Sequence, residues 1–320
     1  MAKAVCGRFA PTPSGRMHLG NVFCALLAWL SAKKQGGTIT LRIEDLDKPR
    51  CPAGSDMLLE DDLHWLGLNG IPEAAPAEKM HPIIKAAVLT SMPPILHSCK
   101  TGTDLPCFCN RAELHAAQAP HLSDGRILYA GTCRHLTAEQ TAAKARTKDP
   151  AQRLRLPDTA VIFIDGHYGP YTQNLAAECG DIILRRSDGV YAYQLAVVVD
   201  DALMGITEIV RGCDLLSSTP QQLYLYQLLG FTPPAFIHAP LLMAADGRRL
   251  SKRDRDLDLG FLRQHFVSPQ PLIGLLAFLA GLLPAPEPVS AKELLPLFSW
   301  QKVPHNNIIV SEKLLNLFKL

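Results

Sequence analysis

Two short segments, separated by more than two hundred residues, carry residue types that suit nucleotide binding. The first, RFAPTPSGRMHLGN, spans residues 8–21 and places His18 just before an apolar stretch, with Gly15 and Gly20 near proline-broken turns. Glycines let a backbone approach a ligand closely, and free N–H groups at a helix N-terminus favour a phosphate. An imidazole here could donate to a phosphate oxygen. The other interpretation is a tight strand-to-helix turn with a surface histidine.

The second segment, GRRLSKRDRD, spans residues 247–256 and places Lys252 among arginines in an expected loop. A mobile loop with a lysine can close over a triphosphate and stabilise the charge that develops during phosphate transfer. Taken by itself, the segment also fits a solvated basic surface loop.

A third group of residues suits a ligand with acidic and basic groups. The stretch RIEDLD, residues 42–47, ends a β-branched run in acids, so Glu44 could face an ammonium group. Asp45 and Asp47 could instead cap the next turn. Arg211 lies in an apolar segment, and a buried arginine is costly unless it meets an anion. It therefore indicates either a structural ion pair or a ligand carboxylate.

Composition limits the classes of protein to consider. The chain has 320 residues, of which 48% are hydrophobic and 19% charged, as in a soluble globular protein. A net charge of +2 does not by itself indicate nucleic acid, so an RNA partner would need a local basic face. The longest apolar run, residues 272–283, is too short to span a bilayer, and residues 1–10 resemble no secretory signal. Nine cysteines, most of them single, predict reduced thiols. We therefore expect a cytoplasmic protein without a membrane partner.

Apolar patterning predicts the elements that would position these segments. The N-terminal part alternates strand and helix, at residues 4–10, 21–35, 36–47 and 54–68. This order implies an α/β fold with a parallel sheet and right-handed crossovers.

Further along, the pattern is less regular. A connecting region with some helix is expected at 69–104, and a helix followed by a linker at 137–158. The stretch SDG, residues 187–189, predicts a hairpin turn between two strand-like runs. A helix with Pro220 at its first position is expected at 219–230, and largely helical structure after residue 256.

Together, the histidine and lysine segments resemble the two signature motifs of class I aminoacyl-tRNA synthetases. RFAPTPSGRMHLGN, LRIEDLDKPR, AYQLAVVVDDALMGITEIVRGCDLL and RLSKR are similar, more narrowly, to the glutamyl branch and its short glutamyl-Q tRNA(Asp) synthetases. The resemblance covers most of residues 5–69, 105–135 and 180–260. It implies a Rossmann-like catalytic domain with a parallel sheet, an inserted zinc-containing subdomain and a short helical C-terminal region. The corresponding sections are 1–104 (first catalytic half), 105–180 (insert), 181–260 (second catalytic half with the lysine loop) and 261–320 (helical, without an anticodon-binding domain).

The resemblance also implies roles for individual residues. ATP would be bound by His18, Gly20, Asn21 and Lys252, with His18 and Lys252 as the catalytic pair. Glutamate would be bound by Arg8, Phe9, Ala10, Pro11, Thr12, Glu44, Tyr193 and Arg211. Two arginines, a glutamate and a tyrosine hydroxyl complement the two carboxylates and the ammonium of glutamate. Which arginine takes which carboxylate stays open.

The chain departs from the family pattern in three places. Asn21 occupies the fourth place of the histidine signature, and Arg249 and Arg253 flank the lysine motif. Residues 70–104 match the family poorly, which concerns the RNA-facing part rather than the activation site.

The resemblance further implies a structural zinc ion, held by Cys107, Cys109, Tyr129 and Cys133, since the family has Cys-x-Cys followed by Tyr-x-x-x-Cys. Three thiolates and a phenolate could complete a tetrahedral site. Tyrosine is an unusual ligand, and His115, His121 or His135 could replace it. Three free thiols in a small hairpin are the alternative.

The implied reaction begins with activation of L-glutamate by ATP, with Mg²⁺, to glutamyl-adenylate, without a need for RNA. The short family then esterifies queuosine in the anticodon arm of tRNA(Asp). Only about sixty residues follow the lysine segment, too few for the anticodon-binding region of a full synthetase. A truncated synthetase that charges a tRNA 3′ end and a catalytically silent RNA-binding paralogue are the alternatives. A monomer is expected.

Overall fold

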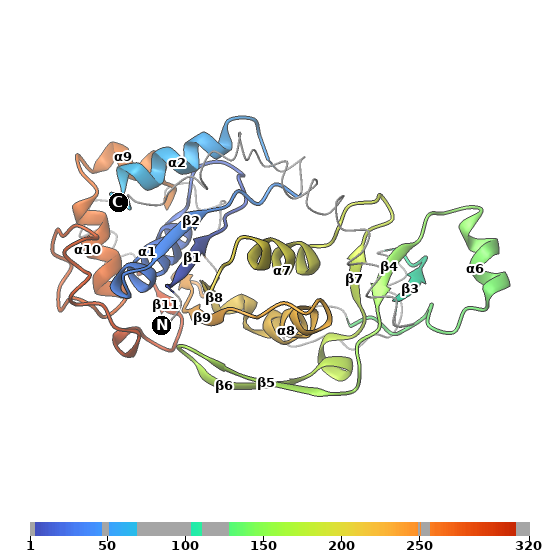
Figure 1. The fold of residues 1–320 in the computed structure, drawn as a ribbon. Coiled ribbons are helices and arrows are strands. Elements are labelled where there is room, and N and C mark those ends of the chain that lie inside the picture. Colours follow the sequence, from blue (N-terminus) through green and yellow to red (C-terminus); the bar gives the residue numbers. More distant parts are fainter. Residues whose placement is uncertain are drawn as a thin grey trace.

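The computed structural model describes residues 4–46, 51–68, 104–110, 128–248, 250 and 257–311. Its centre is a parallel sheet of four strands in the order β2-β1-β8-β9 (Figure 1). The strands are β1 (Cys6–Phe9), β2 (Thr38–Leu41), β8 (Glu208–Gly212) and β9 (Ala235–Ala239). The α/β fold with a parallel sheet that the sequence predicts is therefore confirmed.

Helices cover both faces of this sheet, because successive residues of a strand point to opposite sides. Val210 and Ile237 belong to one apolar core, whereas Ile209 and Phe236, each one residue earlier, belong to another. The first core contains side chains of α1 (Leu19–Lys34), α2 (Ser55–Trp65), α9 (Leu259–His265) and α10 (Gln270–Leu279). The second contains side chains of α7 (Tyr193–Leu203) and α8 (Thr219–Leu228).

A second, antiparallel sheet extends away from the first, to the right in Figure 1. It pairs β3 (Asp104–Cys107), β4 (Ala151–Leu154) and β7 (Ile182–Arg185) in the order β3-β4-β7, and α6 (Ala138–Ala145) lies beyond it. The remaining short elements are η2 (Leu175–Cys179), η3 (Cys213–Ser218), β10 (Leu242–Met243), η5 (Trp300–Lys302) and β11 (Ile308–Ile309).

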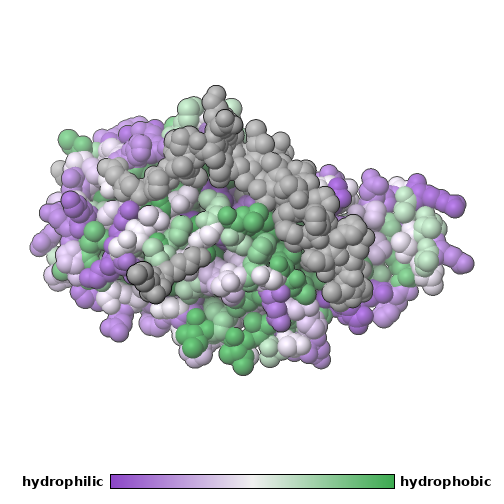
Figure 2. All heavy atoms as spheres, in the orientation of Figure 1, coloured by the Kyte–Doolittle hydropathy of each residue, from purple (hydrophilic) through white to green (hydrophobic). Residues whose placement is uncertain are grey.

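A hairpin of β5 (Ala160–Asp165) and β6 (Gly169–Asn174) connects the two regions along the lower edge of Figure 1. Its inner side chains join the second core, while Ile162 and Ile164 are 70% and 79% exposed. Figure 2 shows apolar side chains along the corresponding edge of the surface. The tip of the hairpin reaches β9, where the Gly166 amide donates to the carbonyl of Phe236 at 2.9 Å.

Three sequence expectations need correction. Residues 187–189 do form a turn, but the run after it becomes α7 rather than a strand, after one isolated bridge between Arg185 and Tyr191. Residues 195–201 of this helix are all buried, and a continuous apolar run fits either a helix or a strand. The expected linker at 137–158 contains β4, which pairs on both sides.

The third correction concerns the C-terminal part. In the described residues beyond α10, up to 311, turns, η5 and β11 replace the expected helices, and prolines at 284, 286 and 288 interrupt helical structure. Of the connecting region expected at 69–104, residues 69–103 lie outside the described residues and Asp104 begins β3. None of the helices in the described ranges has both the length and the apolar character needed to cross a membrane.

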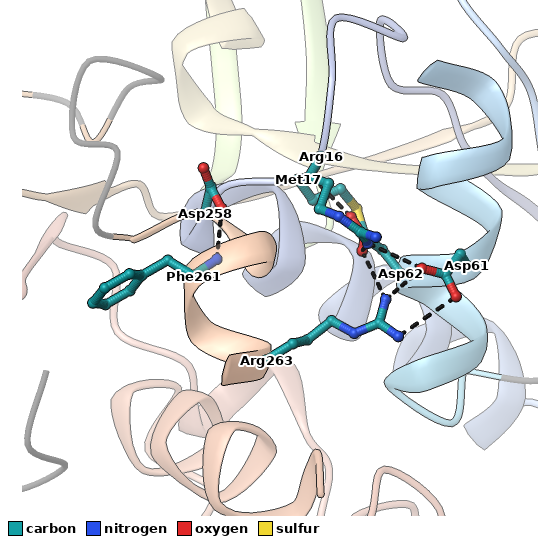
Figure 3. Close-up of polar contacts among 7 residues, drawn as sticks. All are labelled: Arg16, Met17, Asp61, Asp62, Asp258, Phe261 and Arg263. Atoms are coloured by element: carbon teal, nitrogen blue, oxygen red, sulfur yellow. Dashed lines mark hydrogen bonds and ion pairs between the residues drawn. The ribbon is translucent and has the colours of Figure 1, made fainter. Parts of the chain in front are cut away.

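Asp62 joins α2, the loop before α1, and α9 (Figure 3). Its Oδ2 accepts the Met17 amide at 3.1 Å, and its Oδ1 pairs with Arg16 and lies 3.4 Å from the Arg263 guanidinium. Asp61 pairs with both arginines from a more exposed position. Burial raises the pKa of Asp62, although Met17, Arg16 and Arg263 favour the charged form. These contacts hold the loop and both helices in one place.

Replacing Asp62 with alanine should destabilise the protein far more than replacing Asp61. Asp62 is 0% exposed, so its loss leaves the Met17 amide unpaired and both arginines weakened, at a cost of about 2–4 kcal/mol. Asp61 is 49% exposed, and its loss should cost less than about 1 kcal/mol. Guanidinium unfolding followed by circular dichroism measures both. Equal losses would show that burial of Asp62 is unimportant.

Candidate active site

The carboxyl ends of the parallel strands open onto a pocket of about 350 Å³, a size typical of small-molecule sites. Of the residues expected to bind glutamate or ATP, all but one line this pocket. Those that line it are Arg8, Phe9, Ala10, Pro11, Thr12, His18, Gly20, Asn21, Glu44, Tyr193 and Arg211. The exception, Lys252, lies outside the described residues. Segments far apart in the sequence thus converge on one cavity.

The segment after β1 reaches the pocket because it continues to pair with the segment after β2. The Arg42 amide donates to the Phe9 carbonyl at 2.9 Å, and the Glu44 amide donates to the Pro11 carbonyl at 3.0 Å. Gly15, with φ of 113°, makes the turn that follows, in a conformation that favours glycine. This backbone pairing fixes Glu44 at the pocket wall.

His18 caps the N-terminus of α1 with its imidazole. Nδ1 accepts the Gly20 amide at 3.1 Å, so the neutral ring carries its proton on Nε2. A Cβ on residue 20 would come within 3.1 Å of the His18 ring, so a larger residue there would push on the imidazole. The arrangement combines an imidazole N–H donor with the amides of a helix N-terminus, and this combination suits a phosphate.

Arg8 is buried and held by an acid that the sequence reasoning missed. Its Nε donates to Asp201 Oδ1 at 3.3 Å, and an Arg42 terminal nitrogen donates to the same oxygen at 2.5 Å. Arg42 Nε also donates to Glu44 Oε1 at 3.0 Å. Burial opposes the charge on Arg42, but Asp201 and Glu44 outweigh it and raise its pKa. The sequence signal for Asp201 was an acidic pair inside the apolar run VYAYQLAVVVDDA, residues 190–202.

Arg211 extends from β8 and is held by neutral groups. It donates to His238 Nε2 at 3.0 Å, to Gln222 Oε1 at 2.8 Å and to Thr219 Oγ1 at 2.8 Å. No carboxylate forms an ion pair with it among the residues that the structure describes. Burial lowers the pKa of Arg211 to about 10. A buried guanidinium in this state suits a ligand that brings the anion.

The described residues on the two sides of Lys252 contact the pocket or the histidine loop. Leu250, just before Lys252, borders the cavity. On the other side, the Leu259 amide donates to the Met17 carbonyl at 2.8 Å, and Asp258 forms a β-bridge with His18. Leu250 thus borders the pocket, and Asp258 lies beside His18.

The expected metal ligands gather in the antiparallel region. The sulfurs of Cys107, Cys109 and Cys133 all lie within 4.8 Å of one another, and those of Cys109 and Cys133 are 3.7 Å apart. Tetrahedral zinc with Zn–S bonds of about 2.3 Å requires sulfurs about 3.8 Å apart. The Tyr129 hydroxyl lies 3.7 Å from the Cys107 sulfur and accepts the Cys133 amide at 2.8 Å. The donor set therefore fits a structural zinc ion.

Of the candidates for the fourth zinc ligand that the sequence left open, Tyr129 is the one that the structure places at the thiol cluster. His135 is not part of the thiol cluster, and His115 and His121 lie outside the described residues. Burial raises the pKa of the Cys109 thiol to about 12, and Cys107 adds to the effect. Binding a cation would replace the proton that the Cys109 thiol otherwise keeps.

Comparisons with known proteins agree with this geometry. The family model described as tRNA synthetases class I (E and Q), catalytic domain, matches residues 4–316. A glutamyl-Q tRNA(Asp) synthetase of Nitratidesulfovibrio vulgaris is 42% identical over 98% of both chains, and one of Symbiobacterium thermophilum is 44% identical over 95% of both. The solved glutamate tRNA ligase of Elizabethkingia meningosepticum, in complex with its amino acid, superposes with a TM-score of 0.80 at 27% identity, covering 99% of this chain and 69% of that one.

The sequence matches extend over nearly the whole chain, and the solved relative has the same fold. The chain belongs to the class I tRNA synthetases of the glutamyl and glutaminyl branch and, within that branch, to the glutamyl-Q tRNA(Asp) synthetases.

Proposed function

We propose that the chain activates L-glutamate with ATP, forms glutamyl-adenylate without help from RNA, and transfers the glutamate to queuosine in the anticodon loop of tRNA(Asp). The observation that carries the first step is the convergence of Arg8, Glu44, Tyr193 and Arg211 on one pocket beside His18. The shared name of the relatives supports the second step. A monomeric state and a cytoplasmic location stay predictions from the sequence.

The charges around the pocket complement glutamate. Arg211, with neutral partners among the described residues, would attract one carboxylate, and Arg8 would attract the other. Glu44 would face the ammonium group, and the Tyr193 hydroxyl adds a polar contact. A substrate with one carboxylate would leave a buried guanidinium without an anion, so the site should discriminate strongly against it.

In the activation step, an oxygen of the substrate's α-carboxylate attacks the α-phosphorus of ATP in line. The bond from this phosphorus to the bridging oxygen breaks, and pyrophosphate leaves with the electron pair. The enzyme needs no nucleophile, so its contribution is positioning and charge stabilisation. His18 would donate from Nε2 to a phosphate oxygen, Lys252 would stabilise the developing negative charge, and Mg²⁺ would accompany ATP.

In the transfer step, a hydroxyl of queuosine attacks the activated carbonyl, an ester forms, and AMP leaves. The RNA needs a basic surface, because contacts to phosphates dominate its affinity. The antiparallel region carries exposed cationic side chains that suit this purpose: Lys144, Arg146, Arg185 and Arg186.

Glutamate-dependent ATP–pyrophosphate exchange, measured without tRNA, tests the activation step. Arg211→Lys keeps the charge but loses the planar fork, so the KM for glutamate should rise about tenfold or more, with a smaller change for ATP. Arg155→Lys, at an exposed position just after β4, is the matched control and should behave like the wild type. Absence of exchange in the wild type at any glutamate concentration would favour a silent RNA-binding paralogue.

A transfer assay with altered tRNA tests the second step. Transfer of radiolabelled glutamate to tRNA(Asp) should survive removal of the 3′-terminal adenosine, because the acceptor hydroxyl is on queuosine. It should disappear when the tRNA lacks queuosine. The reverse pair of results would establish charging of the tRNA 3′ end instead.

We also propose that Cys107, Cys109, Cys133 and Tyr129 hold one structural zinc ion, on the basis of their spacing. Among the described residues, these four side chains belong to a small apolar cluster, so a metal would add stability to this local core.

Elemental analysis should find about one zinc per chain, and a strong chelator should lower Tm by roughly 5–10 °C. Cys107→Ser should lose the metal. Cys179→Ser, outside the cluster, should keep it and serves as the control. If the purified protein contains no zinc and the chelator does not change its Tm, the zinc proposal is wrong. The proposal for the activation site would not be affected.

A further inference from the structure

We propose that Asp165 and His238 form a positioning pair that orients the Arg211 guanidinium in the pocket without neutralising it. The pair lies behind Arg211, on the tip of the β5–β6 hairpin and on β9. For the identity of the ligand, the inference rests on the proposed function, because Arg211 is the expected carboxylate binder. Its geometry, however, can be tested separately.

Asp165 is almost fully enclosed, and its acceptor capacity is taken up by named donors. Oδ1 accepts the amides of His167 at 3.0 Å, Tyr168 at 2.9 Å and His238 at 3.2 Å. Oδ2 lies 2.5 Å from His238 Nδ1. Burial opposes ionisation of Asp165, but the bonds from His238 and Tyr168 outweigh it, so its pKa lies below the ordinary value. The carboxylate is therefore a fixed anchor.

The tautomer of His238 follows from its two neighbours. Arg211 Nε can only donate a hydrogen bond, so His238 Nε2, 3.0 Å away, must accept it. The ring proton is then on Nδ1 and points to Asp165. Burial lowers the pKa of His238, although the nearby Asp165 acts in the opposite direction. The lowered pKa favours the neutral ring. Asp165 thus determines that a lone pair, and not a proton, faces Arg211.

A neutral imidazole can orient the Arg211 guanidinium without neutralising its charge, which a carboxylate could not do. A direct Asp–Arg pair would also orient the guanidinium, but it would compete with the substrate's carboxylate for the same charge. The neutral ring keeps the anion one residue away from Arg211. Thr219 and Gln222 fix the other nitrogens with neutral oxygens, in the same manner. The charge stays available to the ligand while the orientation is fixed.

Two substitutions of His238 separate the two bonds of its ring. His238→Asn places an amide near the Nδ1 position, keeps the bond to Asp165 and loses the acceptor for Arg211. His238→Gln places a carbonyl near the Nε2 position, keeps the acceptor and loses the bond to Asp165. We expect the KM for glutamate to rise about tenfold in His238→Asn and only a few-fold in His238→Gln, with the KM for ATP nearly unchanged.

Thermal stability should follow the opposite order, with His238→Gln the less stable variant, because it leaves Oδ2 of the buried Asp165 without the His238 ring donor. This crossing of the two orders is what a positioning role requires. If both the glutamate KM and Tm favour the asparagine variant, His238 merely holds the hairpin, and the proposal is wrong.

Asp165→Asn tests the tautomer itself. An amide NH₂ facing Nδ1 would move the ring proton to Nε2, where it opposes the Arg211 N–H, as a wrong tautomer does in other enzymes. We expect ¹⁵N NMR of labelled histidine to show Nδ1–H in the wild type and Nε2–H in Asp165→Asn. Asp158→Asn makes the same change at an exposed site beside the hairpin and should leave His238 unchanged.

The NMR result does not depend on activity. A wild-type ring protonated on Nε2 would overturn the inference even if glutamate is activated. The expected tautomers together with no exchange in the wild type would instead refute the proposed function.

Discussion

The pocket depends on one constraint: the Arg211 guanidinium must stay charged in the protein interior without a carboxylate directly beside it. Arg211 satisfies it through oxygens of Thr219 and Gln222 and a ring nitrogen of His238, which hydrogen-bond without cancelling charge. Those partners come from β9 and α8, so the strand order of the sheet is also what assembles them. Arg8 is stabilised differently, because it has a carboxylate partner, Asp201. Arg42 donates to the same oxygen of Asp201, so this carboxylate neutralises the charge on Arg8 only in part.

The central sheet and the residues that line the pocket could be predicted from the sequence. Alternating strand and helix patterns near the N-terminus were enough for the parallel sheet, and the resemblance to a known family selected residues that the fold does bring to one pocket. Their roles in binding, and the boundaries of the four expected sections, stay predictions. The strand-like run expected after residues 187–189 is a helix instead, because an apolar run that is buried on all sides does not distinguish helix from strand.

The supporting residues could not be found in this way. Asp201 meets Arg8 across 193 positions, and Asp165 meets His238 across 73. No local spacing encodes such a contact, since it depends on how the hairpin and α7 dock onto the sheet. An acid inside an apolar run was the one available sign for Asp201. For His238 there was none, because a histidine in a short buried strand is unremarkable in sequence.

The parallel sheet also has a consequence for how the protein is made. Cys6 of β1 bonds to Thr207, the residue just before β8, and 201 positions separate the two. A ribosome that adds about 5–20 residues per second needs roughly 10–40 s to cover that distance. Until then, the β8-facing edge of β1 lacks its native partner strand, and the first core lacks Val210 of β8 and Ile237 of β9. The nascent chain should therefore depend on chaperones more than its modest size suggests, until β8 and β9 leave the exit tunnel.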